Sequence, residues 1–181
     1  MKILAIGTSN NAKSINRTLA SYTASLVTNA DVDMLDIADY EMPIFSDVRE
    51  QELGQPEQAR EFVQRIKEAD ALVLSFAEHN GSYTAAWKNL FDWASRIEKK
   101  VFQDKPVIYL STSPGPGGAA SVMKTAVESA PFFGAHVVES VSVPSFHDNY
   151  DPEDGTFTNP QILANLEAAA QSLSSATGAA A

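Results

Sequence analysis

The chain contains no cysteine, so it can form no disulfide, supply no thiolate nucleophile and offer no sulfur ligand to a metal. Its three histidines, His79, His136 and His147, do not have the spacing of a metal site. A GxSxG serine motif is also absent. The side chains therefore indicate neither nucleophilic nor metal catalysis, and reactivity would have to come from a bound cofactor.

Basic residues are few as well: 13 lysines and arginines stand against 23 aspartates and glutamates, which gives a net charge of -10. A protein with this charge repels nucleic acid and anionic membranes over long range, so we expect neither as a partner. An anionic ligand would have to be held locally, by backbone amides or at the N-terminus of a helix.

Long apolar runs are missing, and none of the segments is long enough to cross a bilayer. The apolar start, Met1–Ile6, stops at Gly7, too early for the core of a signal peptide. We therefore expect a cytoplasmic protein in which Met1–Ile6 forms the first strand.

The 181 residues, of which 44% are hydrophobic, suit a single domain that spans residues 1–181 and buries a large core. The alanine-rich end, residues 174–181, is expected to fray.

Five apolar segments alternate with helical patterns along the chain. The expected strands are residues 1–6, 32–37, 71–76, 107–110 and 136–143, and the last helix is expected at 159–174. Such alternation predicts an α/β fold with three layers, a parallel sheet covered by helices on both faces. We expect the flavodoxin-like strand order 2-1-3-4-5, because it places the loops after strands 1, 3 and 4 on one edge.

The long connection 38–55 is expected to rim a binding site, since loops of this length inside compact domains are often functional. The alternative is a packed surface loop with Met42, Ile44 and Phe45 in the core, and both interpretations are compatible.

The loop after the first strand is rich in hydroxyl and amide side chains and leads into a helix whose free N–H groups attract a phosphate. The candidate donors are Ser9, Asn11, Ser14 and Asn16. Alternatively, Ser14 only caps the helix and the rest is solvated loop. Neither a GxGxxG motif nor a P-loop occurs, so the loop does not indicate a dinucleotide or a nucleoside triphosphate.

The other two loops suit a flat ring. The turn at Asn80-Gly81 would expose backbone amides to it, although Asn-Gly is also common in ordinary turns. Glycines after the fourth strand allow close approach of backbone to a ligand. With the phosphate at Ser9–Asn16, the predicted ring contacts are Glu78, His79, Asn80, Gly81, Ser82, Tyr83, Ser113, Pro114, Gly115, Gly117 and Gly118.

Four stretches resemble the flavodoxin-like NADPH-dependent FMN reductase family, whose members include quinone, azo-dye and chromate reductases. The stretches are Gly7 through Arg17, Glu78 through Ser82, Lys88 through Arg96, and Ser111 through Gly115. They occur in the family's order, and the resemblance spans Lys2 to Ser145. It implies that the first stretch holds the FMN phosphate, that the second lies along the isoalloxazine, and that the fourth faces the ring from the other side.

The resemblance implies an enzyme in which FMN takes a hydride from NADPH or NADH and passes electrons to a small acceptor such as a quinone, free flavin, azo compound or metal oxyanion. The alternative is a flavodoxin-type electron carrier that serves a protein partner. The sequence departs from the family's pattern at Ala77, at His79 and at Asn11, where an arginine is usual. Loss of that arginine lowers the expected FMN affinity unless Lys13 or Arg17 compensates.

The expected helix after the third strand carries more large apolar residues than one stripe requires: Trp87, Leu90, Phe91, Trp93, Ala94 and Ile97. In the resembled family this helix packs in a two-fold interface, so we expect a homodimer or a dimer of dimers. The alternative is that one tryptophan lies under residues 144–158 of its own chain.

Overall fold

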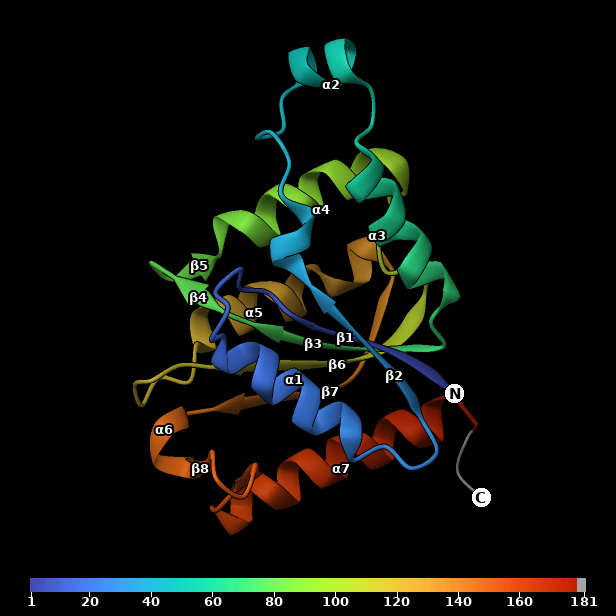
Figure 1. The fold of residues 1–181 in the computed structure, drawn as a ribbon. Helices are drawn as coiled ribbons and strands as arrows, with labels where there is room; N and C mark the ends of the chain where they lie inside the picture. The colour runs from blue at the N-terminus through green and yellow to red at the C-terminus, as the bar shows by residue number, and fades with distance from the viewer. Residues whose placement is uncertain (179–181) are drawn as a thin grey trace.

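The computed structural model describes residues 1–178 and contains a central parallel sheet of five strands (Figure 1). Its order is β2-β1-β3-β6-β7, which confirms the predicted order 2-1-3-4-5. The strands are β1 (Lys2–Gly7), β2 (Asp31–Asp36), β3 (Ala71–Phe76), β6 (Lys105–Thr112) and β7 (Ala135–Val143).

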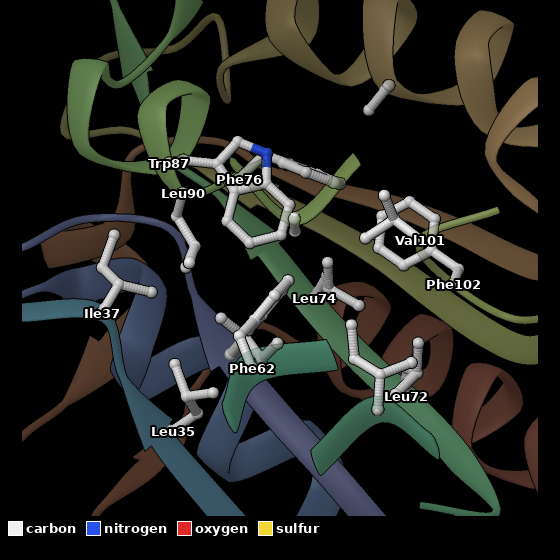
Figure 2. Close-up of a cluster of buried hydrophobic side chains, with 14 of the residues drawn as sticks. Leu35, Ile37, Phe62, Leu72, Leu74, Phe76, Trp87, Leu90, Val101 and Phe102 are labelled. Atoms are coloured by element: carbon white, nitrogen blue, oxygen red, sulfur yellow. The ribbon is translucent and has the colours of Figure 1, made fainter. Parts of the chain in front are cut away.

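Helices cover both faces of the sheet, because successive side chains of each strand point to opposite sides. Ile3 and Ala5 of β1 pack with α1 (Ile15–Ser25) and α7 (Pro160–Ala176). Leu4 and Ile6 belong to the cluster on the other face, which includes residues of α3 (Glu57–Glu68), α4 (Ala85–Ile97) and α5 (Ala120–Ser129). Figure 2 shows part of this second cluster.

The start of α7 agrees with the predicted cap. The Asn159 side chain accepts hydrogen bonds from the backbone N–H groups of Gln161 and Ile162, and Pro160 occupies the first helical turn. The helix ends at Ala176, two residues beyond the predicted end, and residues 179–181 of the expected frayed segment lie outside the described residues. No helix within residues 1–178 combines the length and the apolar character needed to span a membrane.

Several short elements lie between the main ones. They are η1 (Ile37–Tyr40), α2 (Asp47–Leu53), the hairpin of β4 (Glu78–His79) and β5 (Ser82–Tyr83), η2 (Ala130–Phe133), α6 (Phe146–Asn149), and the hairpin of β8 (Tyr150–Asp151) and β9 (Thr156–Phe157). The sequence did not predict these elements, because each has fewer than eight residues and shows no clear period.

The connection 38–55 is ordered rather than structureless. Met42 is buried and Phe45 is packed against the core, as expected, but Ile44 is 73% exposed. The connection packs along α4, where the side chain of Asn89 bonds to the N–H of Phe45 and the carbonyl of Met42. This part of the connection therefore packs on the helix, and its expected place at the rim of a binding site stays a prediction. The helix α2 projects outward beyond α4 (Figure 1).

The second apolar side of α4 is covered by the same connection, which corrects the expectation of an interface at Trp93. Trp93 is fully buried, its indole N–H donates to the carbonyl of Pro43 at 2.8 Å, and its ring meets Phe45 edge-on at 5.1 Å. The alternative interpretation identified the wrong covering segment, since Phe146 and Phe157, from residues 144–158, pack on the opposite face of the sheet.

Candidate functional site

Three loops follow neighbouring strands at the carboxyl edge of the sheet. The register pairs Gly7 of β1 with Ser75 of β3, and Phe76 of β3 with Ser111 of β6. The loops after β1, β3 and β6 therefore begin side by side, at the place where ligands bind in open parallel sheets. This arrangement brings together the three segments that the sequence singled out.

Thr8 locks the first loop to the second. Its N–H donates to the carbonyl of Ser75 at 2.9 Å, and its hydroxyl accepts from the N–H of Ala77 at 3.0 Å. The Thr84 hydroxyl donates to the Thr8 carbonyl at 2.6 Å and accepts from the N–H of Trp87, which caps α4. Neither threonine was predicted to have a role. The only local signal is the position of Thr84 three residues before Trp87, which is typical of a helix cap.

Asn16 ties the first helix to two strand ends, which corrects its predicted role as a side-chain donor to a phosphate. The side chain is buried; its carbonyl oxygen accepts from the Ser75 hydroxyl at 2.7 Å and from the Thr112 N–H at 3.2 Å. Its amide nitrogen donates to the Thr112 carbonyl at 3.2 Å. Asn16 therefore positions the N-terminus of α1 at the centre of the edge.

The remaining polar residues of the first loop shape it and still offer donors. Ser14 caps α1 by accepting from the N–H of Arg17, as the alternative interpretation expected. Ser9 accepts from the N–H of Asn11, and the Asn11 side chain accepts from the N–H of Lys13. Each serine hydroxyl retains one proton to donate, and the Asn11 side chain retains its amide N–H groups. All three residues can therefore hold an anion.

Asn11 stands where the resembled family usually has an arginine, and two basic residues, Lys13 and Arg17, follow it in the chain. The structure gives these two residues different surroundings. Arg17 forms an ion pair with Asp36, so its guanidinium is already neutralised. Lys13 is exposed and forms no ion pair with any residue of the described chain, 1–178. Lys13 is thus the cation that remains for a ligand phosphate.

The second loop is the β4–β5 hairpin, in which Asn80 and Gly81 have φ angles of 53° and 77°. His79, Asn80, Gly81 and Ser82 are exposed, and a side chain added at Gly81 would meet no protein atom within 4 Å. Glu78 does not face outward freely, because its carboxylate accepts from the N–H of Val122 in the first turn of α5 at 2.9 Å.

Tyr83 turns away from the exposed side of the hairpin, contrary to its predicted place against a ring. Its own ring packs beside Phe76 at 5.8 Å and its hydroxyl lies beside Ser129, while burial raises the pKa of the phenol. The hairpin therefore presents residues 79–82 at the edge and sends Tyr83 into the protein.

The third loop is braced by the segment after β7. The carbonyl of Gly115 accepts from the N–H of Ser145 at 2.9 Å, and the carbonyl of Ser113 accepts from the N–H of Phe146 at 3.1 Å. Pro114 and Gly117 are exposed, and a side chain added at Gly115 or Gly117 would meet nothing within 4 Å. This part of the loop can approach a ligand closely.

Gly118 differs from the other glycines of this loop because it is tightly packed inside the protein, so the structure gives it a structural role and its predicted contact with a ligand stays a prediction. It is buried with a φ of 56°, and a Cβ there would lie 2.5 Å from the Ser142 hydroxyl. Its carbonyl accepts from the hydroxyls of Ser111 and Ser142, both at 2.7 Å. The conformation and the contact together require glycine.

The edge therefore combines the N-terminus of a helix, which suits an anion, with two loops of accessible backbone. The predicted site residues that lie in these loops with groups open to a ligand are Ser9, Asn11, Ser14, His79, Asn80, Gly81, Ser82, Ser113, Pro114, Gly115 and Gly117. This arrangement suits a molecule with a phosphate at one end and a flat ring at the other.

Comparison with protein families gives one assignment for most of the chain. Residues 1–148 match the sequence model of the family described as NADPH-dependent FMN reductase. The chain is 35% identical over 122 residues to a 2-hydroxy-1,4-benzoquinone reductase of Burkholderia sp, a match that covers 66% of this chain and 64% of the relative. It therefore spans just under two thirds of that relative.

A second relative is matched over more of its length, and a solved structure shares the fold. An NAD(P)H-dependent FMN reductase of Pseudomonas aeruginosa is 29% identical over 157 residues, covering 84% of this chain and 83% of the relative. The flavoenzyme NAD(P)H:(acceptor) oxidoreductase of Paracoccus denitrificans superposes with a TM-score of 0.77 at 23% identity, over 98% of this chain and 97% of that protein.

Proposed function

The chain belongs to the NADPH-dependent FMN reductase family, and on that basis we propose that it is an oxidoreductase in which bound FMN accepts a hydride from NADPH or NADH and passes electrons to a small molecule. The observation that carries the proposal is the edge formed by the loops after β1, β3 and β6, whose hydroxyls, amides and open backbone match a phosphate and a flat ring. We take quinones as the first class of acceptor to test, because one relative is named a benzoquinone reductase.

In this proposal the phosphate of FMN lies at the N-terminus of α1. Ser9, Asn11 and Ser14 donate to it together with the free backbone N–H groups of the first turn, and Lys13 supplies the positive charge. Asn16 acts indirectly by fixing the position of that terminus against Ser75 and Thr112.

The ring would lie between the β4–β5 hairpin and the loop after β6. The hairpin offers the backbone of residues 79–82, and Gly81 leaves room because it has no side chain. Glu78 holds the hairpin against α5 and Thr8 holds its base to β1, so the ring would meet a preformed surface.

The protein groups in this edge position the reactants rather than react themselves. The edge holds no cysteine, and no cluster of three or more histidine, aspartate and glutamate side chains able to hold a metal occurs among residues 1–178. An enzyme of this kind works where reduced nicotinamide dinucleotides are available, so we retain the cytoplasm as the expected compartment.

We also propose that the chain assembles as a homodimer or a dimer of dimers. Because Trp93 is buried in its own chain, the interface must use other residues. The large apolar side chains that the structure leaves exposed are Ile44, Val48, Leu53, Val127 and Phe132, and clustered exposed apolar residues often mark contact surfaces.

The test of the enzymatic function is anaerobic stopped-flow mixing of the FMN-loaded protein with NADPH and, separately, with NADH. We expect the visible flavin absorption to disappear as the dinucleotide reduces the flavin, and to return when an added benzoquinone reoxidises it. A loaded protein that neither dinucleotide reduces would favour the electron carrier, and a colourless protein that ignores added FMN would refute the cofactor assignment.

A further inference from the structure

A cavity of about 170 Å³ lies between α4, α5 and β6, on the inner side of the β4–β5 hairpin. Aromatic rings form most of its wall: Phe76, Phe102 and Tyr109 are buried, and Trp87 and Phe91 come from α4. Figure 2 shows Phe76, Trp87 and Phe102 from this region. The two charged residues that line it, Lys88 and Asp92, neutralise each other as an ion pair.

One polar atom in this wall has no partner. The hydroxyl of Tyr109 is buried, and it is the single buried side-chain nitrogen or oxygen within residues 1–178 that no protein group satisfies. Phe76 and Phe102 pack edge-on against the Tyr109 ring, at 4.9 and 6.2 Å between centroids. Burial raises the pKa of this phenol far above its ordinary value, and the nearby Tyr83 adds to the effect, so the hydroxyl stays neutral.

An unsatisfied hydroxyl in such a wall is costly, and buried polar groups nearly always have a partner. A partner that the protein does not supply must come from outside, either as water or as a ligand. The cavity is larger than a water requires, since one water occupies about 30 Å³. An apolar cavity of about 150 Å³ accommodates a benzene ring.

The cavity is separate from the edge assigned to FMN. Tyr83 lines the cavity, whereas residues 79–82 of the same hairpin are exposed and do not line it. At this volume the cavity can enclose one six-membered ring but is too small to enclose the three fused rings of a flavin. None of the residues after β1 and β6 that the proposed function assigns to FMN lines this cavity.

We propose that this cavity binds a neutral, single-ring aromatic molecule that carries one hydroxyl, the chemistry of a phenol, and that Tyr109 is its hydrogen-bond partner. The aromatic wall favours a flat ring through edge-on contacts, and the neutral rim offers no net charge for an ion. The inference goes beyond the proposed reductase function and does not depend on FMN binding.

The experiment is a ¹⁹F NMR titration of the whole protein, with and without FMN, using 4-fluorophenol and fluorobenzene as matched probes. We expect saturable binding of both to the wild type. Tyr109→Phe keeps the ring and removes the hydroxyl, so it should weaken 4-fluorophenol by about tenfold and leave fluorobenzene unchanged. Tyr22→Phe is the control, because it removes a hydroxyl on the opposite face of the sheet, where Tyr22 contacts Thr156.

A second variant keeps the proposal testable if Tyr109→Phe fails to fold. Ser95→Leu places bulk at the rim of the cavity, and it should reduce the binding of both probes. Absence of saturable binding to the wild type, which would leave water as the partner of Tyr109, overturns the proposal, and so does 4-fluorophenol affinity that is unchanged in Tyr109→Phe. FMN titration of the same samples reports on the reductase site independently.

Discussion

At the scale of single residues, Asn16 and Asn11 show how one residue type serves two different purposes within six positions. Asn16 is buried and joins α1 to β3 and β6 through three hydrogen bonds, whereas Asn11 is exposed and bonds only within its own loop. The spacing in the sequence makes the two equivalent as candidate phosphate donors. Burial gives Asn16 a structural role and leaves only Asn11 accessible to the proposed phosphate.

We predict that Asn16→Ala lowers the free energy of unfolding by about 2–4 kcal/mol, because it leaves the Ser75 hydroxyl and both backbone groups of Thr112 without a partner. FMN affinity should fall as well, since the N-terminus of α1 loses its fixed position. Urea denaturation and an FMN titration measure the two effects.

Asn11→Ala is the matched control for that experiment. We expect it to change the free energy of unfolding by less than about 0.5 kcal/mol, as is usual for exposed positions, while weakening FMN. Equal stability of the Asn16→Ala variant and the wild type would show that the hydrogen bonds to Ser75 and Thr112 do not hold the edge together.

At the scale of elements, the β4–β5 hairpin depends on backbone conformation more than on side-chain contacts. Both central residues have positive φ, as required in a type I′ turn, and only glycine, asparagine and aspartate adopt it readily. The Asn80-Gly81 pair is therefore an ordinary hairpin turn, and at the same time the part of the second loop that stands open to a ligand.

Substitution of Gly81 separates these two roles. Gly81→Val should strain the turn by about 1–2 kcal/mol and abolish FMN binding, because a branched side chain resists positive φ and fills the space of the ring. Gly81→Asn should keep the turn and the stability of the wild type, yet still weaken FMN through its bulk. FMN affinity equal to that of the wild type in both variants would show that the hairpin does not face the ring.

The sequence predicted the main elements well because their signals are local. The strand Ala71–Phe76 coincides with its predicted range, and Asn159-Pro160 marks the start of α7 through a cap that spans three residues. The partners of side chains could not be predicted in this way. Asn16 bonds to Thr112, which is 96 positions away, and Trp93 donates to Pro43, which is 50 positions away. No period or spacing reports on pairs so distant.

The candidate site shows the same limit. The predicted strand order implied that the loops of Ser9, Gly81 and Gly115 begin at one edge, and they do, whereas their contact with FMN stays a prediction. The inward turn of Tyr83 and the burial of Gly118 depend on contacts with Ser129 and Ser142, which belong to other elements. The sequence identified these loops but could not distinguish their inner from their outer residues.

At the scale of the whole molecule, the net charge of -10 opposes the approach of FMN and of the nicotinamide dinucleotides, which are anions. Local donors must therefore outweigh a repulsive field, and the first loop offers such donors at Lys13 and at the N-terminus of α1. This balance makes the position of a single exposed lysine more important than it would be in a basic protein.

Assembly is the last property of the whole molecule that the structure allows to be tested. The outermost helix, α2, has no buried residue, and Val48 and Leu53 on it are 62% and 58% exposed (Figure 1). We predict that the wild type is a dimer or larger at micromolar concentration, and that Val48→Glu combined with Leu53→Glu yields monomers, because charges would be desolvated at the contact. Light scattering measures the mass.

Two comparisons make this test specific. The double substitution should leave the free energy of unfolding nearly unchanged, since neither side chain is buried in its own chain. Trp93→Glu should instead unfold the protein, because it buries a charge against Phe45 and removes the hydrogen bond to Pro43. A wild type that is monomeric, or a double variant that stays assembled and folded, would exclude α2 as the interface. A Trp93→Glu variant that is folded and monomeric would indicate that α4 forms the interface, as first expected from the sequence.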